Sequence, residues 1–173
     1  MVGQISQIDE HLFLCSAGAV KTDIVRALGV TNIVNCTTEI SNLNVPSVEC
    51  VQIPVEDTPS ARLGMYFDRC ADKIQQVHKS GGKILVHCVA GISRSPCVCI
   101  AYLMKYQRMR LDQAYYHIKN RRRVIHPNVG FWRQLIEFER RLFGRNTVKM
   151  IPTGTGPIPD IYKKEQKKDY GVI

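Results

Sequence analysis

A cysteine and an arginine stand six positions apart in this chain, at Cys88 and Arg94, with a glycine between them. Apolar residues before the cysteine predict a strand over 83–86, and those after the arginine predict a helix from about Ser95 to Gln107. A loop between a strand and a helix N-terminus turns its backbone N–H groups toward a bound anion. We therefore expect this loop to hold a phosphate group.

The side chains of the loop suit a reaction at that phosphate. The planar guanidinium of Arg94 matches two phosphoryl oxygens, and Gly91 lets the backbone turn without a clashing side chain. The positive surroundings favour a thiolate at Cys88, which can attack phosphorus in line and form a phosphocysteine intermediate that water hydrolyses without a metal. The residues expected to bind the phosphate are Val89, Ala90, Gly91, Ile92, Ser93 and Arg94.

The alternative interpretation is a buried core cysteine at Cys88 and an unrelated surface arginine at Arg94. A cysteine and an arginine at this spacing recur by chance in many chains. Here they come with a preceding strand, Gly91, a flanking Ser95 and a following helix. This combination favours phosphate chemistry over core packing.

The run from His87 to Ser95 resembles the signature loop of the cysteine-dependent protein tyrosine phosphatases, in their dual-specificity branch. The likeness continues in Ala101-Tyr102-Leu103-Met104-Lys105 and in Pro127-Asn128-Val129-Gly130-Phe131-Trp132-Arg133-Gln134-Leu135. From about residue 4 to residue 151 the chain is similar to the small atypical members of that branch. Those members lack the separate kinase-docking domain of the larger mitogen-activated protein kinase phosphatases.

The resemblance implies a role for several residues. Cys88 is the expected nucleophile, Arg94 binds the phosphate and stabilises the transition state, and Ser95 helps the thiolate leave in the second step. His87 is expected to orient the loop by hydrogen bonding. Asn128 matches a position that supports the active site, although a cap at the start of the last predicted helix explains it equally well.

A proton donor for the leaving group is expected on a separate loop, because a carboxylate beside the phosphate would repel it. Asp57 lies in the polar stretch 56–60 after a predicted strand. It precedes Cys88 by 31 residues, which resembles the family's placement of its general acid. Glu56 is the local alternative for this role, and turn formation before Thr58-Pro59 is the alternative role for Asp57.

The rest of the chain supplies the elements that must position these residues. We expect one or two short strands within 4–14, further strands at 31–35 and 49–53, helices at 20–28, 62–78, 111–120 and 128–143, and an edge strand at 147–151. This order predicts an α/β fold of the protein tyrosine phosphatase type, with a central, mostly parallel sheet and helices on both faces. The expected division is a single catalytic domain over 1–151 and an irregular basic tail over 152–173.

Composition limits the other possibilities. The 173 residues, 45% of them hydrophobic, suit one domain, and no stretch resembles a membrane span, an export signal or a lipid anchor. Seven cysteines without metal-ligand spacing favour free thiols, so we expect a cytoplasmic or nuclear protein with no metal and no cofactor. The net charge of +9 attracts anionic partners, but without interleaved aromatic residues it does not predict nucleic-acid binding.

The resemblance, together with the phosphate loop, implies a metal-independent dual-specificity protein phosphatase, a hydrolase of phosphotyrosine and of phosphoserine or phosphothreonine. The expected substrates are phosphoproteins, with members of mitogen-activated protein kinase pathways as candidates. A phosphoinositide phosphatase, an RNA 5′-phosphatase and a phosphopeptide-binding module would also contain a phosphate loop. The loop brings no lysine to the pocket, which disfavours the phosphoinositide phosphatase. The complete set of Cys88, Arg94, Ser95 and Asp57 argues against the binding module.

Two further hypotheses concern residues near the loop. Arg123, where many relatives carry a proline, is expected either to bind the second phosphate of a bisphosphorylated peptide or, more simply, to be a solvated helix end. Cys36, Cys97 and Cys99 are candidates for a reversible disulfide with an oxidised Cys88, with core packing as the simpler alternative.

Overall fold

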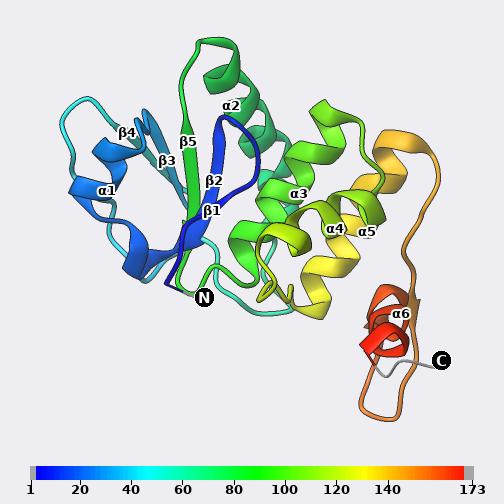
Figure 1. Ribbon diagram of the computed structural model, residues 1–173. Coiled ribbons are helices and arrows are strands. Elements are labelled where there is room, and N and C mark those ends of the chain that lie inside the picture. Colours follow the sequence, from blue (N-terminus) through cyan, green and yellow to red (C-terminus); the bar gives the residue numbers. More distant parts are fainter. Residues whose placement is uncertain (1–2, 170–173) are drawn as a thin grey trace.

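Five strands form the central sheet of the computed structural model, which describes residues 3–169 (Figure 1). In the order in which they lie side by side, they are β1 (Ser6–Gln7), β2 (Leu12–Ser16), β5 (Ile84–Cys88), β3 (Asn32–Asn35) and β4 (Glu49–Gln52). The strands β2, β5, β3 and β4 run parallel, and β1 pairs antiparallel with β2. The prediction of a mostly parallel central sheet is confirmed.

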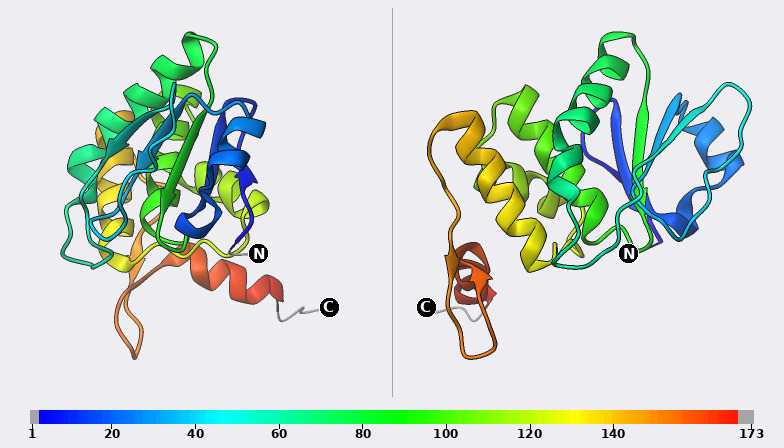
Figure 2. Two further views of the ribbon diagram at one scale, coloured as in Figure 1. Left: turned by 90° about the vertical axis from the view of Figure 1, so that its left-hand side faces the viewer. Right: turned by 180° about the vertical axis from the view of Figure 1, so that it is seen from behind.

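Helices cover both faces of this sheet, as predicted. Alternate residues of a strand point to opposite faces of the sheet. On one face, Phe13 and Leu85 pack in a small core with Val25 of α1 (Thr22–Ala27). On the other face, Leu14 and Val86 belong to the larger core. The helices of the larger core are α2 (Phe67–Lys79), α3 (Arg94–Gln107), α4 (Leu111–Arg121) and α5 (Val129–Phe143). Figure 2 shows the sheet lying between α1 and these four helices.

The helix α3 is the centre of the larger core. It contacts α2, α4, α5 and the sheet, and every residue from 94 to 104 is buried. A helix surrounded on all sides needs no polar face, which explains its apolar run. Since Arg94 is its first residue, the predicted phosphate loop leads directly into the most buried helix of the protein.

Some boundaries differ from the prediction by a few residues. The strand β5 continues to Cys88, so the cysteine is itself the last strand residue. The helix expected over 62–78 opens with the 3-10 turn η2 (Leu63–Tyr66), and α2 begins at Phe67. A second 3-10 turn, η1 (Ala17–Ala19), follows β2. The stop predicted at Gly29 is confirmed, because this glycine follows α1 with a φ of 71° that other residues rarely adopt.

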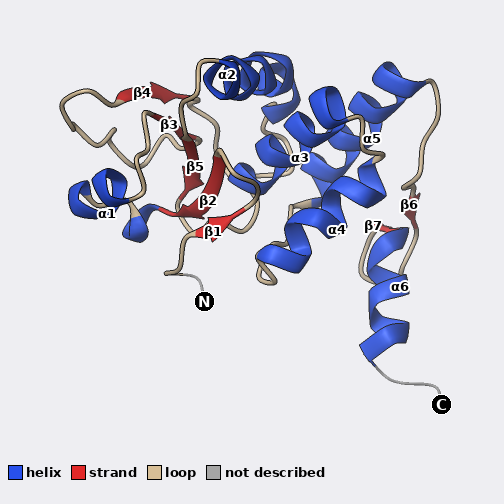
Figure 3. Ribbon diagram, turned by 45° about the horizontal axis from the view of Figure 1, so that its top comes forward, coloured by secondary structure: helices blue, strands red, loops and turns tan. Residues whose placement is uncertain are grey.

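The C-terminal segment departs further from the prediction. The strand β6 (Met150–Ile151) does not join the central sheet but pairs with β7 (Ile158–Pro159), and α6 (Asp160–Asp169) follows (Figures 1 and 3). The expectation of an irregular tail is therefore wrong over the described residues, while 170–173 lie outside them. The domain division after residue 151 stays a prediction.

Aromatic contacts explain why this segment is ordered. The hydroxyl of Tyr162 accepts a hydrogen bond from Nε1 of Trp132 at 2.8 Å, and its ring stacks on that of His126 with centroids 4.7 Å apart. Ile161 is buried beside them. Ile161 and Tyr162 are adjacent and are followed mainly by lysines and other polar residues, so they form no periodic apolar pattern. The sequence alone therefore did not predict α6. Within residues 3–169, no helix is long and apolar enough to cross a membrane.

Candidate active site

The predicted phosphate loop lies at the carboxyl end of β5, in the middle of the sheet. The register of the neighbouring strands places Ser16 opposite Cys88 and Asn35 opposite His87. Beyond Cys88 the chain turns at Gly91, whose φ is 68°. A Cβ at this position would lie 2.7 Å from the carbonyl oxygen of Cys15. Glycine is thus required both for the turn and for the close approach to β2.

The thiol of Cys88 lies inside the loop and has two hydrogen-bond donors. The backbone N–H of Gly91 is 3.2 Å from the sulfur and the hydroxyl of Ser95 is 3.1 Å away. Cys88 and Ser95 are both buried. Donors that converge on a sulfur stabilise a thiolate more than a neutral thiol. This part of the site therefore has the chemistry expected of a nucleophile and of a thiolate leaving group.

The side chain of Arg94 is buried below the loop and has partners on one side only. Its terminal nitrogens donate to both carboxylate oxygens of Glu39, at 2.7 and 3.0 Å, and Nη1 also donates to the carbonyl oxygen of Val55 at 2.9 Å. Its Nε is buried and has no hydrogen-bond partner. A buried guanidinium N–H without a protein partner is rare, and an anion bound in the loop would supply an acceptor for it.

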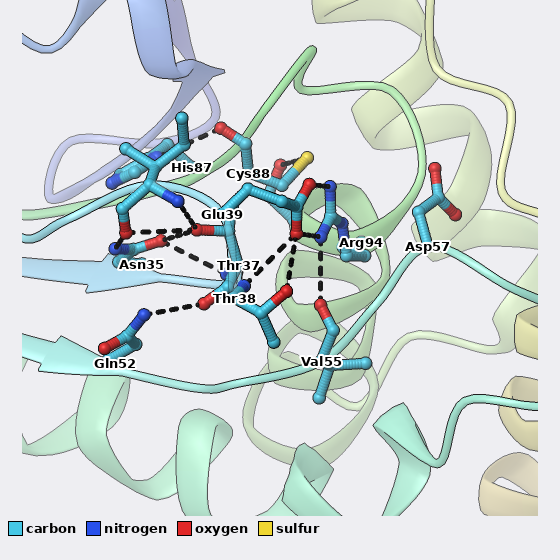
Figure 4. Close-up of polar contacts among 12 residues, drawn as sticks. Asn35, Thr37, Thr38, Glu39, Gln52, Val55, Asp57, His87, Cys88 and Arg94 are labelled. Carbon is cyan, nitrogen blue, oxygen red and sulfur yellow. Dashed lines mark hydrogen bonds and ion pairs between the residues drawn. The ribbon is translucent and has the colours of Figure 1, made fainter.

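Glu39 is a member of this site that sequence reasoning missed. In Figure 4 its carboxylate faces the guanidinium of Arg94. The hydrogen bond from Arg94 holds the pKa of Glu39 down, at about 2, so the carboxylate is ionised at every physiological pH. A signal existed: Glu39 follows the strand at 32–35, and the carboxyl ends of parallel strands meet at one edge of a sheet.

A second buried arginine, Arg122, holds the loop from the other side and was also missed. It donates to the carbonyl oxygens of Gly91, at 2.8 Å, and of Ala90, at 3.2 Å. Burial lowers the pKa of Arg122, but the guanidinium stays cationic because the ordinary pKa of arginine is so high. The burial of Arg122 could have been inferred from the sequence. This residue follows α4 directly and comes four residues after Ile118, which lies on the buried face of that helix. Arg123, the residue singled out from the sequence, is exposed.

Asn128 connects the loop, the proposed general acid and the last helix of the larger core. Its Nδ2 donates to Oδ1 of Asp57 at 2.9 Å, and its Oδ1 accepts from the N–H of Phe131 at the start of α5. Its own N–H donates to the hydroxyl of Ser93. The interpretation of Asn128 as a helix cap is confirmed, and its support for the active site stays a prediction that the hydrogen bond to Asp57 favours.

The polar loop 56–60 brings Asp57 to the rim of the site. Asp57 and Glu56 are both exposed, and Asn128 donates a hydrogen bond to Asp57. The loop 56–60 packs closely against the first turn of α5 at Gly130. A Cβ at this glycine would lie only 1.9 Å from the carbonyl oxygen of Pro59. The site therefore combines the buried thiol of Cys88 with an accessible carboxyl group from a different loop.

The remaining loop residues divide into exposed and anchored ones. Val89 is exposed and Ala90 and Ile92 are half-buried, whereas Ser93 is buried. His87 is buried behind the loop, and its Nδ1 donates to the carbonyl oxygen of Cys88 at 3.1 Å. Burial lowers the pKa of His87, which keeps the ring neutral. The exposed rim is the part that a substrate side chain would touch.

The neighbouring thiols are those of Cys36, Cys97 and Cys99. All three are fully buried, and burial raises the pKa of each well above its ordinary value. Protonated, enclosed thiols are poor nucleophiles, which favours core packing over a redox role. Between residues 3 and 169, no three His, Cys, Asp or Glu side chains are grouped to hold a metal ion.

Comparisons with known proteins agree with this geometry. Residues 12–141 match the family model described as the dual specificity phosphatase catalytic domain. The chain is 52% identical over 168 residues to dual specificity protein phosphatase 14 of Homo sapiens, covering 96% of this chain and 84% of that protein. It is 42% identical over 165 residues to dual specificity protein phosphatase 18 of Homo sapiens, covering 95% and 88%.

A solved structure with the same fold is that of a mouse putative dual specificity phosphatase complexed with zinc tungstate. It is 33% identical, with a TM-score of 0.78, and the match covers 81% of this chain and 89% of that one. The family model, the two relatives and the solved structure are all dual specificity phosphatases. The chain therefore belongs to the dual specificity phosphatases and is a protein phosphatase of that family.

Proposed function

We propose that phosphoprotein hydrolysis takes place at the loop 88–95 in two steps. In the first, the thiolate of Cys88 attacks phosphorus, the bond from phosphorus to the substrate oxygen breaks, and Asp57 gives its proton to that oxygen. In the second, water attacks the phosphocysteine, Asp57 takes a proton from the water, and the sulfur leaves as a thiolate hydrogen-bonded by Ser95.

Other residues hold the reacting groups in place. The backbone N–H groups of 89–94 and the guanidinium of Arg94 bind the phosphoryl oxygens, while His87 and Asn128 position the loop and Asp57. The observation that carries the proposal is the buried Nε of Arg94, which has no partner in a loop that also holds a hydrogen-bonded thiol. A phosphoryl oxygen bound in the loop would give this N–H its acceptor.

A panel of substrates tests this proposal. Phosphotyrosine and phosphothreonine peptides, phosphoinositides and a 5′-triphosphorylated RNA are assayed with the wild type and with Cys88→Ser, in the presence of a chelator. We expect turnover of the peptides by the wild type alone. Turnover of the lipids or the RNA in preference to the peptides would contradict the substrate class, and activity in Cys88→Ser would contradict the nucleophile.

We also propose that Arg123 binds a second phosphate on bisphosphorylated peptides. It is exposed and cationic, and it lies five residues before Asn128, which reaches Asp57 at the rim of the site. Arg123→Ala should lower kcat/KM for a bisphosphorylated peptide but not for its monophosphorylated form. The matched control is Arg121→Ala, whose exposed guanidinium bonds a helix carbonyl. Equal effects on both peptides would make Arg123 a solvated helix end.

Phosphorylated members of mitogen-activated protein kinase pathways are the candidate substrates, in the cytoplasm or the nucleus. The family membership and the absence of lysine from the loop support phosphoproteins as a class. Trapping with Asp57→Ala in a cell lysate identifies the individual proteins, because this variant should bind phosphate but release the leaving group slowly. Captured proteins that tungstate does not displace would not count as substrates.

A further inference from the structure

The segment 122–128, between α4 and α5, joins the two parts of the proposed site. It forms neither helix nor strand, and it contains Pro127, which has no backbone N–H to donate. The backbone N–H of His126 donates to the carbonyl oxygen of Ile92 in the phosphate loop, at 2.7 Å. Two residues later, the side chain of Asn128 donates to Asp57. The conformation of this segment therefore decides where Asp57 lies relative to the phosphate loop.

The side chain of Tyr162, on α6, contacts both this segment and α5. Its ring stacks on that of His126, with centroids 4.7 Å apart and planes inclined by 12°. Its hydroxyl donates to the carbonyl oxygen of Pro127, at 3.3 Å, and accepts from Nε1 of Trp132, at 2.8 Å. Trp132 is fully buried, so this hydroxyl lies between a donor fixed in the core and the backbone of the segment. Figure 1 shows α6 on the side of the molecule where β5 ends.

We infer that Tyr162 is a positioning residue for the proposed general acid. By holding His126 and Pro127, it keeps Asn128, and through it Asp57, beside the phosphate loop. This inference rests on the proposed role of Asp57. It concerns a helix outside residues 12–141, the part of the chain that matches the family model, so the family match assigns no role to Tyr162.

The helix that carries Tyr162 has attachments of its own. At its start, the N–H of Asp160 donates to the carbonyl oxygen of Lys149 at 2.8 Å, and Ile161 is buried. Towards its end, Nζ of Lys168 lies 5.5 Å from the centre of the Tyr116 ring on α4. A side chain on an element that is fixed at both ends can define the position of the loop it contacts.

The alternative interpretation is that Tyr162 only attaches α6 to the rest of the protein. Loss of such an anchor would lower stability and leave the reaction unchanged wherever the protein stays folded. Loss of a positioning contact would instead slow the step that needs the acid. Anion binding should survive in either case, because Arg122 holds the carbonyl oxygens of Ala90 and Gly91 separately.

The experiment compares the full chain with its Tyr162→Ala variant on a phosphothreonine peptide and on an aryl phosphate with a good leaving group. The measured quantity is kcat/KM, which covers the steps up to departure of the leaving group. We expect it to fall about tenfold on the peptide, a modest loss for a displaced catalytic group. On the aryl phosphate it should be unchanged, as should the inhibition constant of tungstate.

Two further single variants show which contact matters. Tyr162→Phe keeps the ring on His126 but loses both hydrogen bonds of the hydroxyl, so it should lie between the wild type and Tyr162→Ala. The matched control is Tyr106→Ala, which removes an exposed tyrosine at the opposite end of α3, where its hydroxyl bonds Asp72. It should leave kcat/KM unchanged on both substrates.

A double variant tests whether Tyr162 acts through the acid. In an Asp57→Ala background, Tyr162→Ala should cause no further loss on the peptide, because no acid is left to position. Thermal denaturation of every variant sets the assay temperature below its unfolding transition. Should Tyr162→Ala fail to fold, the same comparisons with Tyr162→Phe decide the question, since phenylalanine keeps the ring in place.

The outcomes are distinct. Equal losses on the two substrates, or a full additional loss in the Asp57→Ala background, would show that Tyr162 acts on the fold or the phosphate loop and not on the acid. Unchanged kcat/KM on both substrates would make it an anchor of α6. Each of these results overturns the inference. Wild-type turnover of the peptide by Asp57→Ala, or an active Cys88→Ser, would instead refute the proposed function, so the two failures cannot be confused.

Discussion

Asn128 uses the two atoms of its side-chain amide for two different tasks. The oxygen caps α5 and the nitrogen holds Asp57, so the helix and the proposed general acid are fixed by one residue. The site is thus a set of hydrogen-bond donors around Cys88 and Arg94, with the carboxyl group of Asp57 held at its rim.

Asp57→Ala should lower turnover about 10²- to 10⁴-fold on phosphothreonine peptides, whose alkoxide leaves poorly without a proton. Aryl phosphates with good leaving groups should be affected much less, and tungstate inhibition should persist. Unchanged turnover, with a loss in Glu56→Ala, would transfer the role to Glu56.

The elements of the fold bring four separate segments to one edge of the sheet. The strand β5 ends at Cys88, β3 leads into the segment of Glu39, and α5 begins beside the acid loop 56–60, which carries the proposed general acid. The contact between α5 and that loop depends on Gly130, because any side chain there would meet the backbone of Pro59. The position of the acid is therefore a property of helix packing as much as of its own loop.

Gly130→Ala should displace the acid loop, since the new methyl group would lie 1.9 Å from the carbonyl oxygen of Pro59. We expect a lower kcat on phosphothreonine peptides, a smaller loss on aryl phosphates, and a destabilisation of about 1–3 kcal/mol from overpacking. Gly154→Ala is the matched control, because nothing lies within 4 Å of its Cβ position. Wild-type kinetics in Gly130→Ala would mean that the loop takes its position independently of α5.

The whole molecule keeps two buried histidines in an uncharged state. His11 and His87 are 6% and 2% exposed, and burial lowers the pKa of each below its ordinary value of 6.5. The unfolded chain binds protons at these rings near pH 6.5, whereas the folded protein binds them only at lower pH. Acidification therefore favours the unfolded state.

The Tm should accordingly be highest above pH 6.5 and should fall as the pH is lowered to 5.5. The pKa of Glu39, lowered to about 2 from 4.5, adds a second loss only between about pH 4.5 and 2, because its ion pair with Arg94 persists above that range. Thermal denaturation at constant ionic strength measures both. Replacing His11 by glutamine, which can still bond Tyr102, should flatten the decline between pH 7.5 and 5.5. A Tm that rises on acidification would contradict this account.

The loop that joins Cys88 to Arg94, the class of fold and most helices could be predicted from the sequence, because each depends on neighbours within one strand, loop or helix. A cysteine and an arginine around a turn keep their relation in any fold that preserves the loop. Apolar spacing likewise identifies the buried face of a helix.

Only the tertiary structure placed Glu39 on Arg94, Arg122 against the loop carbonyls, and Tyr162 against Trp132. These contacts join residues between 30 and 55 positions apart in the chain. Charge and composition alone do not tell a buried arginine from a solvated one, or an anchored tail from a free one. The difference is decided by strand register and helix packing, which bring distant side chains to one edge of the sheet and exclude water from between them.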